Sequence, residues 1–459
     1  MDGFSSFFAI MMLCAGVFLT VRINFFQFTH FGCAIKTALG LGQKRSARSK
    51  QKFDASGVTP FQALSSALGG SIGTANIAGV ASAIAIGGAG AVFYMWLAAL
   101  VGMGVKFCEI VLALRYREKR GGQWCGGAML YIEKGFRKSN TGSRFLQSVS
   151  KPLAAGFALF GLLASSVGTP LVQSNTIAMS VNDAVLLFLP KAEQKTVCII
   201  AGAVTAALVG IVILGGIQRI GKASEIIVPF MAIGYIAICI IVLSRFGGRI
   251  LPAFRDIFSG ALGIKQAVGG AAGFGAARAL RIGMARGVYS NEAGVGSAPM
   301  AHACANTNDP VKQGMYGIFE VFADTIVMCT MTALVVLASG IPLQAGGEIS
   351  GTSIALRAFS TVLPERTTGI FLAVSMLLFA YTSLLGWAVY GMQCAKYLFG
   401  KRAQLPFCIL YTVLTFAGAL MKVDFVWTAG ETLNYLIGKL KFQVDAIGGD
   451  INKPMPVAC

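Results

Sequence analysis

The chain has 459 residues, of which 55% are hydrophobic and only 12% charged, and its formal net charge is +19. A soluble domain has about 25% charged residues, so this chain has too little polar surface to cover a water-exposed globule. The composition excludes an ordinary soluble domain and predicts an all-α polytopic membrane protein.

The first apolar segment follows Asp2, has no basic flank and lacks a small-x-small cleavage site. We therefore interpret it as a retained helix and not as a signal peptide. Apolar stretches of about 17 to 25 residues, the length that crosses a bilayer, predict about eleven transmembrane helices. They lie near residues 3–21, 60–86, 91–115, 152–178, 196–216, 225–244, 261–284, 313–340, 369–395, 405–421 and 425–440.

The basic residues predict the orientation of these helices. Lys and Arg are concentrated in alternate loops, above all in residues 36–52 and 115–151, and basic loops remain cytoplasmic. We expect a multi-pass protein of the cell (inner or plasma) membrane with its N-terminus outside and its C-terminus in the cytoplasm. Because the basic residues alternate with membrane spans, a nucleic-acid partner is not expected.

Signatures of catalysis and metal binding are missing from the sequence. The cysteines form no CxxC or Cys/His spacing, and the two histidines, His30 and His302, lie in unrelated contexts. No Walker loop, nucleophile elbow or His-based triad is present. The chain is therefore not expected to be an enzyme or to hold a metal cofactor.

Two apolar segments are interrupted by glycine. GGSIGTANIAGV begins at Gly69, and GGAAGFGAARALRIGMARG begins at Gly269. Each precedes four further predicted spans, and five is an odd number, so the second set enters the membrane from the opposite side. We predict an inverted five-plus-five repeat, with residues 60–244 and 261–443 as its halves and residues 1–30 as an extra N-terminal helix.

The glycines themselves allow two interpretations. Glycine costs a helix interior about 1 kcal/mol relative to alanine, and glycine-broken segments at matching positions of two halves indicate a transporter binding site. An unwound turn offers N–H groups to a carboxylate and carbonyl groups to a hard cation such as Na⁺. The alternative is close helix packing through small residues, and the spacing leaves both open.

Longer blocks of sequence carry a family resemblance. Residues 73–118 (GTANIAGVASAIAIGGAGAVFYMWLAALVGMGVKFCEIVLALRYRE) resemble the hallmark block of the alanine or glycine:cation symporter family, the sodium:alanine symporters. Three further blocks match in the expected order: GGAMLYIEKGF at 126–136, RGVYSNEAGVGSAPMAHA at 286–303 and TSLLGWAVYGMQCAKYLFG at 382–400. The resemblance implies the architecture of the neurotransmitter:sodium symporters in the APC superfamily, with one extra helix in front. It also implies Na⁺-coupled uptake of a small neutral amino acid, alanine or glycine.

The sequence departs from the family pattern at four positions: Ala75 replaces a glycine, Ala89 a proline, Tyr94 a tryptophan and Met392 a glutamate. Ala75 matters most, because its methyl group disfavours a positive φ and is expected to project towards the substrate.

The resemblance also implies a substrate site. The N–H groups of Thr74 and Ala75 and the Thr74 hydroxyl are expected to bind the substrate carboxylate, and Asn76 offers a side-chain carbonyl to the cation or the substrate. Gln173 is expected to contact polar substrate atoms, with helix–helix hydrogen bonding as its alternative. Phe274 and Trp387 are expected to line the pocket for the substrate side chain. The alternative for both residues is packing or interface anchoring.

For Na⁺, similarity to the wider architecture implies backbone carbonyls of Gly69 and Ile72 and the hydroxyls of Thr382 and Ser383. Uncharged oxygens suit a hard monovalent ion. The alternative is that both hydroxyls bond back along their own helix.

Acidic residues inside apolar spans are costly unless they are paired or functional. Glu320 and Asp324 lie one helical turn apart and are candidates for a gate or a proton site. Glu292 is expected near Arg286 in a structural or inner-gate role. An H⁺-coupled amino-acid symporter therefore remains the closest rival, and a channel or sensor is the rival from another class.

Overall fold

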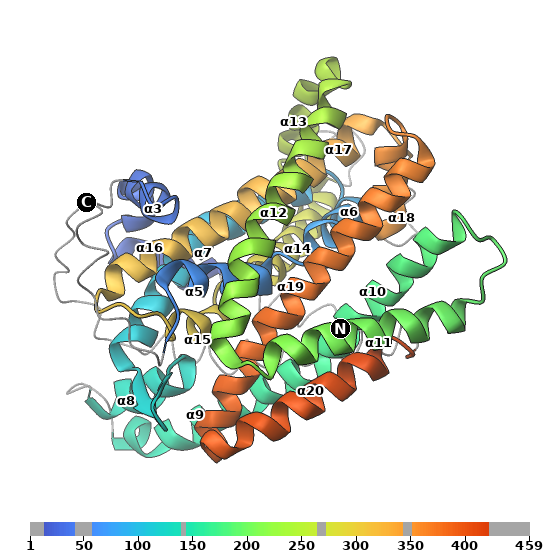
Figure 1. Cartoon of the computed structure of the whole chain (residues 1–459). Helices are drawn as coiled ribbons and strands as arrows, with labels where there is room; N and C mark the ends of the chain where they lie inside the picture. Colours follow the sequence, from blue (N-terminus) through green and yellow to red (C-terminus); the bar gives the residue numbers. More distant parts are fainter. Residues whose placement is uncertain (1–12, 42–56, 139–143, 264–271, 343–350, 422–459) are drawn as a thin grey trace.

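The computed structural model describes residues 13–41, 57–138, 144–263, 272–342 and 351–421, and within these ranges the chain is mostly helical (Figure 1). A short helix, Leu13–Arg22, comes first. Then follow α2 (Phe26–Thr29), α3 (Phe31–Ala38), α5 (Pro60–Ser71), η1 (Thr74–Asn76), α6 (Ala78–Gly87), α7 (Gly90–Tyr116), α8 (Ala128–Lys138), α9 (Arg144–Leu163), η2 (Ala164–Gly168), α10 (Thr169–Leu186), α11 (Gln194–Ile213), α12 (Gly216–Ser244) and α13 (Gly247–Ala261). The remaining helices are α14 (Ala272–Asn291), α15 (Ala298–His302), α16 (Pro310–Val321), η4 (Phe322–Cys329), α17 (Thr330–Ser339), α18 (Gly351–Ser360), α19 (Glu365–Phe399), η5 (Lys401–Ala403) and α20 (Gln404–Gly418). Strands β1 (Glu118–Arg120) and β2 (Gln123–Cys125) form an antiparallel hairpin.

Six helical segments of the described ranges are long and apolar enough to cross a membrane: Gly90–Tyr116, Gln147–Leu186, Gln194–Ile213, Gly216–Ser244, Pro310–Ser339 and Glu365–Phe399. Each overlaps a span predicted from the sequence. Shorter helices occupy parts of the first predicted span and of the span near 405–421. The predicted span 425–440 lies outside the described residues. The chain is a multi-pass, mostly helical membrane protein.

The predicted span 60–86 is a broken helix. Thr59 and Gln62 form a reciprocal capping box at the start of α5, with Pro60 in the first turn. The helix ends at Ser71, where Ile72 and Gly73 adopt extended backbone angles, and the chain continues as the single turn η1 and then α6. We call residues 72–77 the first break.

The second glycine-rich segment differs from expectation. The sequence places its interruption within residues 269–287. Residues 269–271 lie outside the described residues, and from Ala272 to Asn291 the helix α14 is continuous. The helix is broken further along, between α14 and α15, where Glu292, Gly294 and Gly296 all have φ values between 54° and 83°. We call residues 292–297 the second break. Glycines before it serve packing: a Cβ at Gly283 would lie 2.2 Å from the Ala91 carbonyl oxygen.

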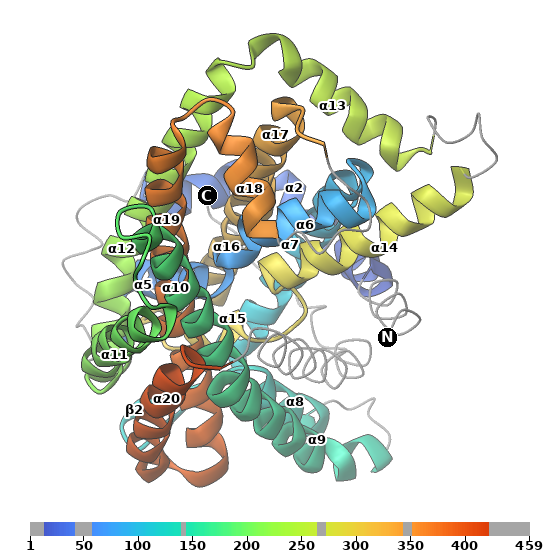
Figure 2. The same ribbon diagram turned by 90° about the vertical axis from the view of Figure 1, so that its right-hand side faces the viewer.

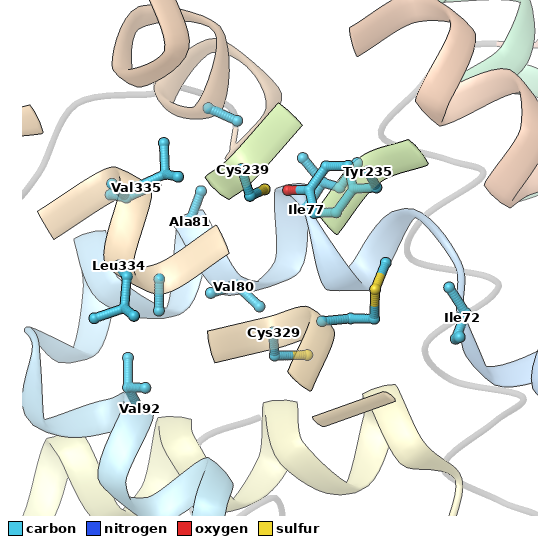
Figure 3. Packing of buried hydrophobic residues seen from close by; sticks show 14 of the residues in the cluster. Ile72, Ile77, Val80, Ala81, Val92, Tyr235, Cys239, Cys329, Leu334 and Val335 are labelled. Carbon is cyan, nitrogen blue, oxygen red and sulfur yellow. The ribbon is translucent and has the colours of Figure 1, made fainter. Parts of the chain in front are cut away.

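The helices around the first break form the main core. Apolar residues of α6 pack against α12 and α17, with Ile72 and Ile77 at the two ends of the break (Figure 3). On the outside of the bundle, Ile226, Phe230 and Ile233 of α12 are 71%, 71% and 68% exposed, as expected for side chains that face lipid. α13 and α18 lie at one end of the molecule, and α8 and α9 lie at the other (Figure 2).

Candidate functional site

The first break leaves backbone groups without helical partners. The Gly73 N–H is bonded to the Asn76 side chain, and in the described part of the chain the N–H groups of Thr74 and Ala75 donate no hydrogen bond. On the other side of the break, the carbonyls from Gly69 to Ile72 receive no N–H in those same ranges. Buried backbone groups are nearly always paired, so the break presents two donors and four acceptors to a ligand.

Polar side chains with unused atoms surround Gly73. A Cβ added there would lie 2.8 Å from Ser383 Oγ and 3.8 Å from Gln173 Nε2. Ser383 Oγ and Gln173 Oε1 are buried and have no hydrogen-bond partner among the described residues, and Thr74 is buried as well. An unsatisfied buried polar group costs about 1–3 kcal/mol, so a ligand at this point would offset that cost.

The glycines before the break serve close packing against α19. Cβ atoms at Gly69 and Gly70 would lie 3.1 Å from the Thr382 carbonyl oxygen and 2.5 Å from the Tyr390 hydroxyl. A Cβ at Gly386 would lie 2.6 Å from the Gly70 nitrogen. Close packing against α19 thus accounts for Gly69 and Gly70, whereas Gly73 lies beside the unpaired oxygen of Ser383.

The residues proposed for Na⁺ fit a cation to different degrees. Thr382 Oγ1 donates to the carbonyls of Leu378 and Phe379 at 3.0 and 3.1 Å, as the helix-bonding alternative predicts. Its oxygen still carries lone pairs, since a hydroxyl has two acceptor positions and one donor. Ser383 follows directly and has its oxygen unused. The Gly69 and Ile72 carbonyls and both hydroxyls are uncharged oxygens, the type of ligand that suits Na⁺, and Gly69 lies beside Thr382.

Asn76 has an internal role that sequence reasoning missed. Its Oδ1 accepts the Gly73 N–H at 2.9 Å and its Nδ2 donates to Asp324 Oδ1 at 2.7 Å. Its backbone carbonyl accepts from Thr332 Oγ1 at 2.7 Å. Asn76 therefore closes the first break and attaches it to the helix that carries Asp324.

The structure describes the other predicted pocket residues, Ala75, Phe274 and Trp387, to different extents. Ala75 is not among the described non-glycine residues with positive φ, so its methyl group causes no backbone strain. Phe274 belongs to α14, but its side chain is outside the described residues. Trp387 lies one turn after Ser383 on α19, where its indole N–H donates to Glu292 Oε1 at 2.9 Å.

Asp324 and Glu320 are both buried and paired in the interior. Asp324 accepts from Asn76, Ser290 and Thr325, each at 2.7 Å. Glu320 lies 3.0 Å from Lys106 Nζ and 3.2 Å from His302 Nε2. Lys106 and Glu320 are 214 positions apart in the chain, so this contact between helices is not visible in any local sequence pattern.

Side chains of the second break bond to one another. Glu292 accepts from Ser297 Oγ at 2.6 Å as well as from Trp387. Asn291 Oδ1 accepts the Ala293 N–H at 3.0 Å, and Asn291 Nδ2 donates to Thr325 Oγ1 at 3.2 Å. The SNEAGVGS stretch had drawn attention to Glu292, whereas nothing in the sequence distinguished Asn291 and Ser290 as contacts of the central helix.

Comparisons with known proteins agree on one family. The profile described as "Sodium:alanine symporter family" matches residues 3–442. The chain is 38% identical over 429 residues to the sodium/alanine symporter AgcS of Methanococcus maripaludis, covering 93% of this chain and 88% of that protein. It is 36% identical to the putative sodium/proton-dependent alanine carrier protein YrbD of Bacillus subtilis (83% and 77% covered). It is also 34% identical to the probable sodium/glutamine symporter GlnT of the same organism (92% and 81% covered).

Among solved structures, the crystal structure of MhsT in complex with L-phenylalanine aligns with a TM-score of 0.52 and 14% sequence identity, over 84% of this chain and 88% of that one. At this identity the likeness shows a shared fold and carries no information on substrate.

Proposed function

The chain belongs to the sodium:alanine symporter family, so its activity is cation-coupled symport of an amino acid, and we propose that the ion is Na⁺ and the amino acid small and neutral, alanine or glycine. The observation that carries this proposal is the first break, where free N–H and carbonyl groups meet the unpartnered oxygens of Ser383 and Gln173. Uptake proceeds by alternating access, in which the break faces each side of the membrane in turn.

The substrate carboxylate binds the N–H groups of Thr74 and Ala75 and the Thr74 hydroxyl. Anions are favoured where backbone N–H groups converge. The substrate ammonium donates to Gln173 Oε1, and Asn76 Oδ1 has a second lone pair for the same purpose. None of these side chains is charged, which favours a substrate with a neutral side chain. Phe274 and Trp387 form the wall around it.

Na⁺ binds the carbonyls of Gly69 and Ile72 and the hydroxyls of Thr382 and Ser383, where it supplies the positive charge that couples uptake to the ion gradient. The close approach of Gly69 to Thr382 supports Gly69 as a ligand, and the unused oxygen of Ser383 supports Ser383 as a ligand. The architecture proposed with this site has repeats at 60–244 and 261–443, about eleven transmembrane helices and an extra helix within 1–30. The N-terminus lies outside and the C-terminus in the cytoplasm of the cell membrane.

H⁺ coupling is the alternative, and two observations favour keeping it in the test. Asp324 is a fully buried carboxylate, and one relative is described as sodium/proton-dependent. The experiment is uptake of radiolabelled alanine into proteoliposomes at fixed pH, with external Na⁺ or with choline in its place, and a third condition adds a pH gradient in choline. The proposal predicts accumulation above the external concentration with Na⁺ only. Accumulation that persists in choline and follows an imposed pH gradient would instead establish the proton-coupled alternative, and equilibration without accumulation would indicate a channel.

A further inference from the structure

The Asp324 side chain joins the two breaks, although it belongs to neither. It is fully buried on η4, a π-helical turn between α16 and α17. Single π-helical turns within α-helices occur often at functional sites. Its two oxygens accept three side-chain hydrogen bonds at 2.7 Å, from Asn76, Ser290 and Thr325. A buried carboxylate is costly unless such donors surround it, so these contacts are strongly favoured.

Two sets of hydrogen bonds, which we call arms, connect Asp324 to the breaks, and one arm leads to the first break. Asn76 Nδ2 donates to Asp324 Oδ1 at 2.7 Å and to the Asp324 carbonyl at 3.2 Å, and the other end of the same amide accepts the Gly73 N–H. If the Asn76 amide were free to rotate, Gly73 would lose its acceptor. The Asp324 contacts thus fix the amide orientation that closes the turn beside Thr74.

The other arm leads to the second break. Thr325 Oγ1 donates to Asp324 Oδ2 and accepts from Asn291 Nδ2 at 3.2 Å, and Asn291 Oδ1 accepts the Ala293 N–H at 3.0 Å. Ser290, directly before Asn291, donates to the same Asp324 oxygen. The two breaks are thus closed in the same way, each by an asparagine whose carbonyl accepts a backbone N–H and whose amide donates into η4.

We propose that Asp324 is a positioning residue that holds both helix breaks in register, through Asn76 at the first break and through Thr325 and Asn291 at the second. The role in transport rests on the proposed function, because there the first break binds substrate and ion. Asp324 contacts neither of them in this account. Instead it couples the positions of the two breaks. The carboxylate accepts all of its hydrogen bonds only when both breaks are closed, because its donors come from both arms.

The test is amide hydrogen exchange on the full-length protein in lipid nanodiscs, followed in peptides that cover the two breaks and, as reference, α12. The variants are Asp324→Ala, which removes the carboxylate that both arms share, and Thr325→Val, which removes the link through Thr325 and Asn291 and leaves the Ser290 contact in place. Ser339→Ala is the matched control, because that buried hydroxyl lies at the end of the following helix α17 and bonds only locally, to the Val336 carbonyl and the Ile341 N–H. Loss of hydrogen bonds to a charged group is expected to speed exchange about ten-fold or more.

The proposal predicts faster exchange at both breaks in Asp324→Ala, at residues 292–297 alone in Thr325→Val, and at neither in Ser339→Ala, with α12 unchanged in all three. Faster exchange in α12 as well, or a change at one break only in Asp324→Ala, would overturn it. If Asp324→Ala does not accumulate, Thr325→Val decides by itself, since unchanged exchange at 292–297 contradicts the proposed link through Thr325 and Asn291. Alanine uptake is measured on the same proteins. A wild type that transports no amino acid would overturn the proposed function, whereas the exchange pattern would still judge the role of Asp324.

Discussion

Both helix breaks contain glycine, but they differ in the hydrogen bonds that the surrounding side chains make. At the first break, Ser383 Oγ and Gln173 Oε1 are buried without partners among the described residues, next to unpaired backbone groups. At the second, the Glu292 carboxylate accepts from Ser297 and Trp387, and both ends of the Asn291 amide are bonded. The difference teaches that a break in a helix is not by itself a binding site.

The backbone at the two breaks supports the same distinction. In the first break, Ile72 and Gly73 are extended and no non-glycine residue has a positive φ. In the second, Glu292 is held at φ 54°, a conformation that costs a non-glycine residue about 1–2 kcal/mol. Its two hydrogen bonds offset that strain. We therefore propose that the first break binds the ligand and that the second has a supporting role.

The largest effect is expected at the cation oxygens near the first break. In Thr382→Ala with Ser383→Ala, two hydroxyl oxygens are lost and the ion would be left partly desolvated. We expect Na⁺-stimulated uptake to be abolished while the protein still inserts in the membrane. Ser375→Ala, another buried hydroxyl of α19, is the control and should retain transport. Normal Na⁺ dependence in the double variant would refute this cation site.

Thr74→Val nearly preserves volume and removes only the hydroxyl. If the hydroxyl binds the substrate, alanine affinity falls by about 0.5–1.5 kcal/mol for a neutral hydrogen bond and by up to about 3 kcal/mol for one to a carboxylate. As half-saturating alanine concentration, this is a rise of about two-fold to more than 100-fold. An unchanged value would remove the hydroxyl from the site and leave only the N–H groups of the break.

Trp387→Phe tests the second break. The ring remains, but Glu292 Oε1 loses its indole donor, and a buried acceptor without a partner costs about 1–3 kcal/mol of stability. We expect a lower unfolding temperature in detergent and an unchanged half-saturating Na⁺ concentration. A loss of Na⁺ dependence as complete as that predicted for the Thr382 and Ser383 double variant would mean that the second break takes part in ion binding.

Ala75→Gly should have the smallest effect. Because Ala75 has no positive φ, the change relieves no backbone strain, and we expect alanine affinity to change by about 0.5 kcal/mol or less, which is about two-fold. Removing the methyl group enlarges the space beside the substrate, so uptake of a larger neutral amino acid should increase in competition assays. If affinity and substrate range both stay the same, the methyl group does not face the pocket.

The sequence predicted the elements that depend on local composition. Long apolar runs located the six long helices, and the glycines with Thr74 and Asn76 located the first break. The second break was placed too early, since the glycines around Gly283 look like a break but permit contact with α7. Contacts between distant residues were missed for a similar reason. The bonds from Asn76 to Asp324 and from Lys106 to Glu320 join residues more than 200 positions apart, and no local pattern encodes them.

The most direct measurement compares amide exchange at the two breaks with and without alanine in the presence of Na⁺. If the first break binds the substrate carboxylate, the N–H groups of Thr74 and Ala75 become hydrogen-bonded, and exchange in the peptide that covers residues 72–77 slows with saturating alanine. Exchange at residues 292–297 should change less. Slowing confined to residues 292–297, with no change at 72–77, would contradict the assignment of binding to the first break.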